Sequence, residues 1–314
     1  MRTVFLDKES LPVTVRTPRC SSPYVEYAHT SAPEVVPRLA GAVIAIVNKV
    51  PVGAAELAQL PQLRLIALAA TGYDCIDVGY CRAHGIAVAN VRGYAQHTVP
   101  EHVFALALAL RRNLLSYAQL AGGGDWERSE QFCLYGPPIH DLHGSVLGIV
   151  GAGSIGRATA RLGQGFGMRV IYAASAAAAA DDTDRLPLAR VLAEADVLSL
   201  HCPLTAATRG LIGSEQLRAM KRTAILINTA RGGLVDEAAL AEALREGWIA
   251  GAGFDVLSEE PPTRGNVLLD PLPPNLIVTP HVAWASGEAM RSLADQLTEV
   301  IEAWADGHPR NLVA

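Results

Sequence analysis

Three side chains suited to acid–base chemistry and carboxylate binding each follow an apolar segment late in the chain. Arg231, Glu260 and His281 come a few residues after runs of Val, Ile, Leu, Ala and Gly that are typical of buried parallel strands. Ligands of open α/β sheets bind outside the carboxyl ends of the strands, so we expect these three side chains to lie together. Taken singly, each is more often a surface or loop residue, and their shared placement is what favours a site.

The chemistry of the three residues suits a 2-hydroxy or 2-keto acid. The guanidinium of Arg231 can hold a carboxylate through two parallel hydrogen bonds, which a lysine cannot reproduce. Histidine is the side chain that exchanges a proton near neutrality, so His281 can protonate a carbonyl oxygen as hydride arrives, or take that proton back during oxidation. Glu260 beside it would select the tautomer of the imidazole and favour its protonated form.

A glycine-rich turn predicts where the hydride donor binds. The sequence GAGSIG at 151–156 follows the apolar run 146–150 and precedes a helical segment. In that context the three glycines allow a tight turn, a close approach of the backbone to a pyrophosphate, and close helix–strand packing. The helix N-terminus offers unpaired amides to the phosphates. The predicted dinucleotide contacts are Gly151, Gly153, Ser154, Ile155 and Gly156. A turn that merely needs glycines is the alternative.

The residues that should face the adenosine ribose do not select one cofactor. In an NAD-selective site an acidic residue follows the second strand, but the run 169–173 is followed by Ala174 and Ser175. No Lys or Arg stands between this run and residue 184 to attract a 2′-phosphate. We therefore expect both NAD and NADP to be used, with Ala174 and Ser175 beside the ribose.

Two further segments are candidates for the cofactor groove. His201, Cys202 and Pro203 follow the apolar run 197–200 and should line the groove. Cys202 is not expected to be a nucleophile, because His201 is its only neighbouring base. Asp255 near the end of its strand could accept a hydrogen bond from the nicotinamide carboxamide or could cap a loop, and the sequence leaves both interpretations open.

The elements that carry these residues alternate between short apolar runs and helical segments, which predicts parallel sheets covered on both faces. The predicted strands are 3–6, 42–47, 64–69, 86–89, 146–150, 169–173, 197–200, 224–228, 251–256 and 276–279. A helix is predicted from Thr98, interpreted as its cap residue, to the cations Arg111 and Arg112. A first domain to about Asn90 and a second to about Trp284 are expected. The last helix, 288–306, could belong to either domain.

The composition excludes several classes of protein. The chain has 314 residues, 26 Lys and Arg against 31 Asp and Glu, and a net charge of −5, without the basic block that nucleic-acid binding needs. Its apolar runs are far shorter than the roughly 20 residues that span a bilayer. Asp7 and Lys8 interrupt any apolar signal segment. Five scattered cysteines without a C-x-x-C pair argue against disulfides or a metal site and for the cytoplasm.

The motifs together resemble the D-isomer-specific 2-hydroxyacid dehydrogenases. The matching stretches are GAGSIG at 151–156, HCPLT at 201–205, NTARGGLVD at 228–236, DVLSEEP at 255–261 and TPH at 279–281. The resemblance implies that Arg231, Glu260 and His281 are catalytic. It also implies that the cofactor contacts include His201, Cys202, Pro203, Thr229, Asp255 and His281.

The same resemblance implies an architecture of two doubly wound parallel-sheet domains. A Rossmann cofactor domain, residues 96–284, would be inserted into a flavodoxin-like substrate domain made of residues 1–95 and 285–314. The long helix from Thr98 would then link the domains and help to form a homodimer.

Within the family the chain is most similar to glycerate dehydrogenases that act as hydroxypyruvate reductases. This resemblance depends on VNKVP at 47–51, ATGYD at 70–74, FC at 132–133 and HVAWAS at 281–286. It implies that the amides of Thr71 and Gly72 bind the substrate carboxylate. Asn48 and Lys49 follow an apolar run and could reach the far end of a small substrate, or could form a solvated loop.

The expected reaction is therefore the reduction of hydroxypyruvate and glyoxylate. Phosphoglycerate, phosphite and formate dehydrogenases of the same family remain as enzymatic alternatives. A non-catalytic corepressor that senses a dinucleotide is an alternative of a different class, although a pure sensor needs no proton donor.

Overall fold

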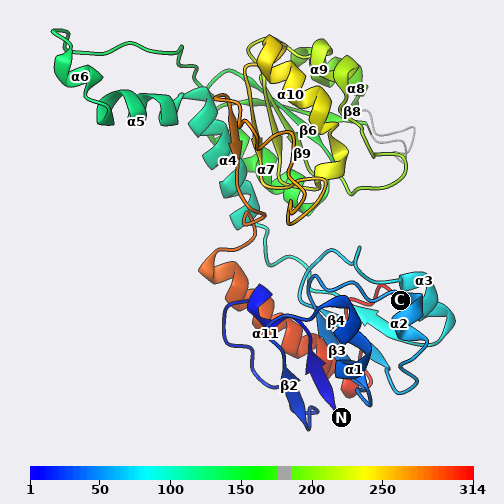
Figure 1. The fold of residues 1–314 in the computed structure, drawn as a ribbon. Helices are drawn as coiled ribbons and strands as arrows, with labels where there is room; N and C mark the ends of the chain where they lie inside the picture. The colour runs from blue at the N-terminus through cyan, green and yellow to red at the C-terminus, as the bar shows by residue number, and fades with distance from the viewer. Residues whose placement is uncertain (175–184) are drawn as a thin grey trace. The chain divides into compact units, whose positions relative to one another are not determined.

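The chain forms two compact α/β units, each with its own parallel sheet (Figure 1). The computed structural model describes residues 1–174 and 185–314. Unit 1 comprises Met1–Ala95 and Ala285–Ala314, and unit 2 comprises Gln96–Trp284. The chain thus leaves unit 1, builds unit 2 and returns to unit 1.

The last helix, α11 (Gly287–Ala305), belongs to unit 1, which decides between the two placements that the sequence left open. Its Glu302 forms an ion pair with Arg16, with 2.7 Å between Oε1 and Nη1. On the same helix, the hydroxyl of Thr298 donates to the carbonyl of Arg16 at 3.0 Å. These bonds attach α11 to the N-terminal part of the chain.

Unit 1 has the strand order β2-β1-β3-β4-β5, which is the flavodoxin-like order. Its strands are β1 (Thr3–Phe5), β2 (Tyr24–Glu26), β3 (Ile44–Val47), β4 (Leu65–Leu68) and β5 (Ala87–Ala89). Its short helices are η1 (Lys8–Ser10), η2 (Ala32–Glu34), α1 (Val35–Leu39), α2 (Ala54–Leu57) and α3 (Val78–Ala83). β3 and β4 are buried along their whole length, as continuous apolar runs predict. The strand order reverses between β1 and β3, so a ligand site is expected outside their carboxyl ends.

Unit 2 has the order β12-β11-β10-β9-β6-β7-β8, an extended Rossmann order with its reversal between β6 and β9. Its strands are β6 (Val146–Val150), β7 (Arg169–Ala173), β8 (Arg185–Leu186), β9 (Val197–Leu200), β10 (Ile225–Asn228), β11 (Gly251–Phe254) and β12 (Leu276–Val278). Its helices include α4 (Thr98–Arg111), α7 (Ser154–Gly165), α8 (Leu188–Glu194), α9 (Ser214–Ala219), η3 (Gly232–Leu234) and α10 (Glu237–Glu246). The strands pair in parallel in both sheets, and both doubly wound sheets are confirmed.

The sequence analysis missed two strands and misread one helix cap. β2 and β8 are edge strands of three and two residues, and they contain charged or half-exposed side chains because only one neighbour pairs with them. Thr98 is the first helical residue of α4, and the N-cap position is His97. The Thr98 hydroxyl donates instead to the carbonyl of Ala283 at 3.2 Å, so a tertiary contact replaces the expected cap.

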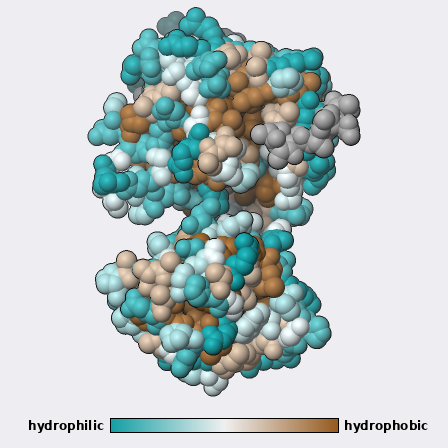
Figure 2. Space-filling model, turned by 90° about the vertical axis from the view of Figure 1, so that its right-hand side faces the viewer, coloured by the Kyte–Doolittle hydropathy of each residue, from teal (hydrophilic) through white to brown (hydrophobic). Residues whose placement is uncertain are grey.

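After α4 the chain forms an arm that projects from the body of unit 2 (Figure 1). The arm contains α5 (Leu114–Gly122) and α6 (Asp125–Arg128), and the two helices are separated by Gly123 and Gly124. Among the described residues, no helix is long and apolar enough to cross a membrane. On the face drawn in Figure 2, hydrophobic residues are interspersed with hydrophilic ones.

Candidate active site

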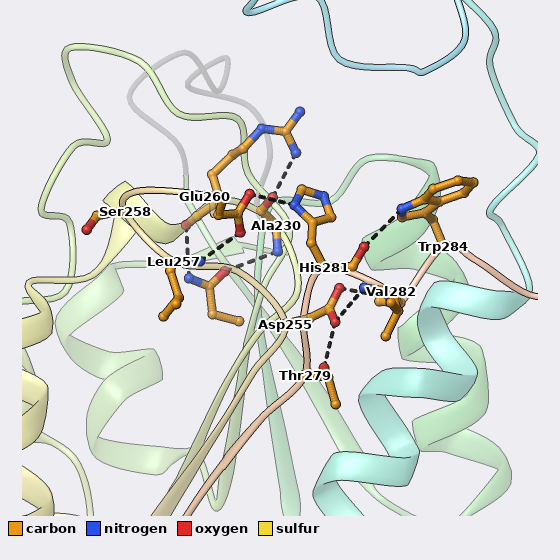
Figure 3. A network of polar contacts seen from close by, with 12 residues as sticks. Ala230, Asp255, Leu257, Ser258, Glu260, Thr279, His281, Val282 and Trp284 are labelled. Carbon is orange, nitrogen blue, oxygen red and sulfur yellow. Dashed lines mark hydrogen bonds and ion pairs between the residues drawn. The ribbon is translucent and has the colours of Figure 1, made fainter. Parts of the chain in front are cut away.

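The three candidate catalytic residues follow three adjacent strands of unit 2. Arg231 follows β10, Glu260 follows β11 and His281 follows β12, and these strands are neighbours in the sheet. Glu260 Oε2 lies 2.6 Å from His281 Nδ1 (Figure 3). The carboxylate and the imidazole are both partly exposed, with 34% and 26% of their side-chain areas accessible. The pair is therefore formed in the folded chain and open to a ligand.

The loop that carries Glu260 is held from two sides. Glu260 Oε1 accepts a hydrogen bond from the amide of Leu257 at 2.8 Å, so both carboxylate oxygens are used. A Cβ atom on Gly232 would lie 1.9 Å from the carbonyl carbon of Leu257, so no side chain fits there. This close approach packs the turn after Arg231 against the loop of Glu260.

Arg231 is placed by Asn228, a fully buried residue at the end of β10. The Asn228 side-chain amide donates to the carbonyl of Arg231 at 2.9 Å, and its oxygen accepts from the amide of Ala230 at 3.1 Å. Arg231 Nη1 in turn donates to the carbonyl of Ala230 at 2.8 Å. A buried amide with both ends satisfied fixes the backbone from which the guanidinium extends.

His281 has a left-handed backbone with φ of +57°, which costs a non-glycine residue about 1 kcal/mol or more. Asp255, which is 1% exposed, offsets this cost. Its carbonyl accepts from the amide of His281 at 2.8 Å, and its carboxylate accepts from the amides of Val282 and Ala283 at 2.9 and 2.8 Å. Of the two interpretations left open for Asp255, the structure shows the loop cap (Figure 3).

Three residues near this cap were missed by the sequence analysis. The Thr279 hydroxyl donates to Asp255 Oδ1 at 2.6 Å, and His102 Nε2 on α4 lies 2.9 Å from the same hydroxyl. The indole of Trp284 donates to the carbonyl of His281 at 3.0 Å. Thr279 lies in the TPH motif at 279–281 and Trp284 in HVAWAS at 281–286, but nothing local to His102 indicates a partner 177 residues away.

The glycine turn has the geometry that a dinucleotide requires. Gly151 has φ of +103°, and a Cβ there would lie 2.5 Å from the backbone nitrogen of Cys202. A Cβ on Gly156 would lie 2.0 Å from the carbonyl oxygen of Gly151, whereas no described atom lies within 4 Å of the Cβ position of Gly153. The first and third glycines are thus needed for packing, and the second leaves open space where a phosphate can approach the backbone.

The helix that begins at this turn supports the same fit. The N-cap of α7 is Gly153, which has no side chain to bond the first amides, those of Ser154 and Ile155. After β10, the Thr229 hydroxyl is buried without a hydrogen-bond partner in the described part of the chain. An unsatisfied buried hydroxyl of this kind is suited to a ligand group. The residues present therefore fit a dinucleotide.

His201 and Cys202 lie across the sheet reversal from the glycine turn. The His201 amide donates to the carbonyl of Val150 at 2.7 Å, and its Nε2 lies 2.9 Å from the hydroxyl of Ser199. Burial lowers the pKa of His201 to about 4, so this imidazole is neutral at pH 7. Burial raises the pKa of the Cys202 thiol, which makes Cys202 a poor nucleophile, as expected. Pro203 continues the same segment.

The ribose position is described only in part. Ala174 is exposed at the end of β7, and its amide donates to the carbonyl of Leu186 at 2.8 Å. Ser175, the other predicted ribose neighbour, lies outside the described residues.

The candidate substrate residues lie in unit 1, at the carboxyl ends of two strands. Asn48 and Lys49 follow β3, and Thr71 and Gly72 lie beyond β4. The Thr71 hydroxyl donates to the carbonyl of Val91 at 2.8 Å. The side chain of the buried Asn90 donates to the carbonyl of Thr71 at 2.7 Å. These two bonds fix the backbone of the turn at residues 71–72.

The fold and site together define an oxidoreductase with a Rossmann dinucleotide-binding unit. Residues 104–283 match the family model of the D-isomer specific 2-hydroxyacid dehydrogenase, NAD binding domain. The chain is 53% identical to a glycerate dehydrogenase of Methylorubrum extorquens over 99% of its length and 98% of the relative's length. It is 41% identical to a glyoxylate reductase of Korarchaeum cryptofilum, with 84% of this chain and 80% of the relative covered.

Solved structures agree with these sequence comparisons. The crystal structure of a protein from Thermus thermophilus superposes with a TM-score of 0.85 at 35% identity, and the whole of both chains is covered. The chain belongs to the family of D-isomer specific 2-hydroxyacid dehydrogenases. It is an NAD-dependent oxidoreductase, which confirms the dehydrogenase class that the sequence predicted.

Proposed function

We propose that this enzyme reduces hydroxypyruvate to D-glycerate and glyoxylate to glycolate with a reduced nicotinamide dinucleotide. The observation that carries the proposal is the 2.6 Å contact between Glu260 and His281 on the sheet edge that also holds Arg231 and the dinucleotide turn. The names of the relatives, a glycerate dehydrogenase and a glyoxylate reductase, support this substrate class.

Each catalytic residue has one task in this proposal. Arg231 binds the substrate carboxylate through its planar fork. His281 donates a proton from Nε2 to the carbonyl oxygen as that oxygen gains negative charge. Glu260 accepts from Nδ1, which keeps the imidazole oriented and favours its protonated form. The bound dinucleotide supplies the hydride.

Other residues bind and position the two ligands. The amides of Thr71 and Gly72 bind the substrate carboxylate, and Asn48 and Lys49 contact its far end. Asp255 holds the loop of His281. The residues that hold the dinucleotide are Gly151, Gly153, Ser154, Ile155, Gly156, Ala174, Ser175, His201, Cys202, Pro203 and Thr229. Both NAD and NADP are used, because neither an acid nor a cation stands at positions 174 and 175.

The test is a panel of 2-keto acids assayed with NADH and with NADPH. Turnover of hydroxypyruvate and glyoxylate is expected, and His281→Ala should lose most of the rate while it still binds the dinucleotide. Turnover of 3-phosphohydroxypyruvate alone, or oxidation of phosphite or formate alone, would replace this function with one of the alternatives. Dinucleotide binding without turnover of any substrate would favour the sensor.

A homodimer formed through the arm is the second part of the proposal. Several large apolar side chains on the arm are exposed, above all Phe132 at 94% and Tyr135 at 82%. Exposed apolar patches of this kind mark protein interfaces. Light scattering should give twice the chain mass, and Phe132→Ser with Tyr135→Ser should weaken the dimer.

We also propose a cytoplasmic location, which fits five cysteines that are all free in the described chain.

A further inference from the structure

A buried carboxylate in unit 1 lies at the point where ligands bind to sheets of this order. Asp7 follows β1 and the segment of Asn48 and Lys49 follows β3, so they flank the reversal of the strand order. Among the described residues, Asp7 (6% exposed) and Asp255 (1% exposed) are the two buried carboxylates. Asp255 holds the loop of His281 in unit 2, which raises the question of what Asp7 holds in unit 1.

Asp7 holds the backbone of the segment that follows β3. Its Oδ1 accepts from the amide of Asn48 at 3.0 Å, and its Oδ2 accepts from the amide of Lys49 at 2.6 Å. The Asn48 side chain, itself buried, donates to the hydroxyl of Ser10 at 2.9 Å. Two consecutive amides directed at one carboxylate leave the segment little freedom, so the directions of the Asn48 and Lys49 side chains are set by Asp7.

Burial of the Asp7 carboxylate is unfavourable for its charged form. Burial raises the pKa of Asp7, whereas the amides of Lys49 and Asn48 and the Lys49 charge lower it. The Cys75 thiol also faces this cluster; burial raises its pKa to about 11, so it adds no charge. An apolar residue of similar size could fill the core here at lower cost. We therefore expect the carboxylate to serve a function through the loop that it holds, and not through core packing alone.

We propose that Asp7 is a positioning residue for substrate specificity, which directs Asn48 and Lys49 toward the part of a 2-keto acid beyond its carbonyl group. The inference rests on the proposed function, because it requires a keto acid as substrate. Hydroxypyruvate carries a hydroxymethyl group in that place, and glyoxylate carries only a hydrogen atom. Loss of the positioning contact should therefore lower kcat/KM for hydroxypyruvate and leave kcat/KM for glyoxylate unchanged.

The decisive variant is Asp7→Asn, in which an amide group faces a backbone N–H that needs an acceptor. We expect the ratio of kcat/KM for hydroxypyruvate to kcat/KM for glyoxylate to fall about tenfold, mainly through KM, as loss of a charge-assisted hydrogen bond predicts. The matched control is Thr30→Val, which removes a hydrogen bond to the carbonyl of Leu6 beside Asp7 and leaves the loop untouched. Its ratio should not change.

A milder variant keeps the inference testable if Asp7→Asn does not fold. Ser10→Ala removes the hydroxyl that accepts from the Asn48 side chain at 2.9 Å and leaves only the longer contact to the Ser10 carbonyl at 3.4 Å, so the same ratio should fall severalfold. An unchanged ratio in a folded Asp7→Asn, or in Ser10→Ala when Asp7→Asn is unfolded, would overturn the inference. A wild-type enzyme that reduces neither keto acid would instead overturn the proposed function itself.

Discussion

Glu260 Oε2 accepts from His281 Nδ1 across 2.6 Å, and the second oxygen of Glu260 accepts from the Leu257 amide at 2.8 Å. A carboxylate can only accept hydrogen bonds, so the proton of this contact is assigned to Nδ1. Nε2 is then the nitrogen left to face a substrate. The Leu257 amide and the His281 imidazole thus bond to the same carboxylate, so the orientation of the proton donor His281 depends on the position of the loop that carries Glu260.

The first prediction is that Glu260→Gln moves the pH dependence of keto-acid reduction to lower pH and slows the enzyme. The neutral amide no longer favours the imidazolium, so His281 is protonated only at lower pH. The measurement is kcat/KM for hydroxypyruvate between about pH 5 and 9, on either side of the ordinary histidine pKa. The control is Glu259→Gln, since Glu259 pairs with Arg264 on the surface. A profile unchanged from wild type would remove Glu260 from proton transfer.

Carboxylate recognition should depend on the shape of the cation and not only on its charge. Arg231→Lys retains the charge and loses the planar fork, so kcat/KM should fall by an amount equivalent to about 1–3 kcal/mol. Arg264→Lys, on an exposed side chain, serves as the control. Steady-state kinetics with a single keto acid is sufficient. Wild-type activity in Arg231→Lys would mean that another group binds the carboxylate.

Cofactor choice should be weak and easily shifted. The kcat/KM values with NADH and NADPH should lie within about a hundredfold, equivalent to roughly 2.7 kcal/mol. Ala174→Asp should shift the preference toward NADH, because it adds an acceptor for the ribose and repels a 2′-phosphate. Ala174→Asn supplies an acceptor without the charge and separates the two effects. A wild-type preference of several thousandfold would point to a discriminating group elsewhere in the chain.

The attachment of α11 should make the stability of the protein depend on pH. The hydrogen bond from Arg16 lowers the pKa of Glu302 from 4.5 to about 2. The Arg16–Glu302 pair therefore stabilises the folded protein fully above pH 4.5, and this stabilisation is lost as pH falls through about 2. Glu302→Gln should lower the free energy of unfolding by about 1–2 kcal/mol at pH 7, since the pair is half exposed on the arginine side.

Urea unfolding of the wild type and of Glu302→Gln at several pH values measures this difference. The free energies of unfolding of the two proteins should become equal as the pH approaches about 2, where the wild-type carboxylate also becomes neutral. Glu288→Gln on the same helix, where the carboxylate is 84% exposed, should cost little at any pH. A difference that stays constant from neutral pH down to about pH 2 would exclude the ion pair as its cause.

The amino-acid sequence by itself determined the class of the fold and the identities of the candidate catalytic residues. Short, continuous apolar runs form the central strands of both sheets, because a strand buried on both faces needs apolar residues at every position. GAGSIG indicated the dinucleotide turn, because only glycine permits the contacts found at Gly151 and Gly156. These signals are local, so each can be interpreted from a short stretch of neighbouring residues.

Only the tertiary structure decided what the buried polar residues do. Asp255 could have bound a cofactor or capped a loop, and its carboxylate accepts three hydrogen bonds from residues 279–283 only because β12 pairs with β11. Asp7 gave no sign in the sequence of its bonds to Asn48 and Lys49, which lie 41 and 42 residues away. A buried carboxylate accepts hydrogen bonds from the amides that the fold brings next to it. Those amides belong to residues that are distant in the sequence, so the neighbouring residues do not indicate which ones they are.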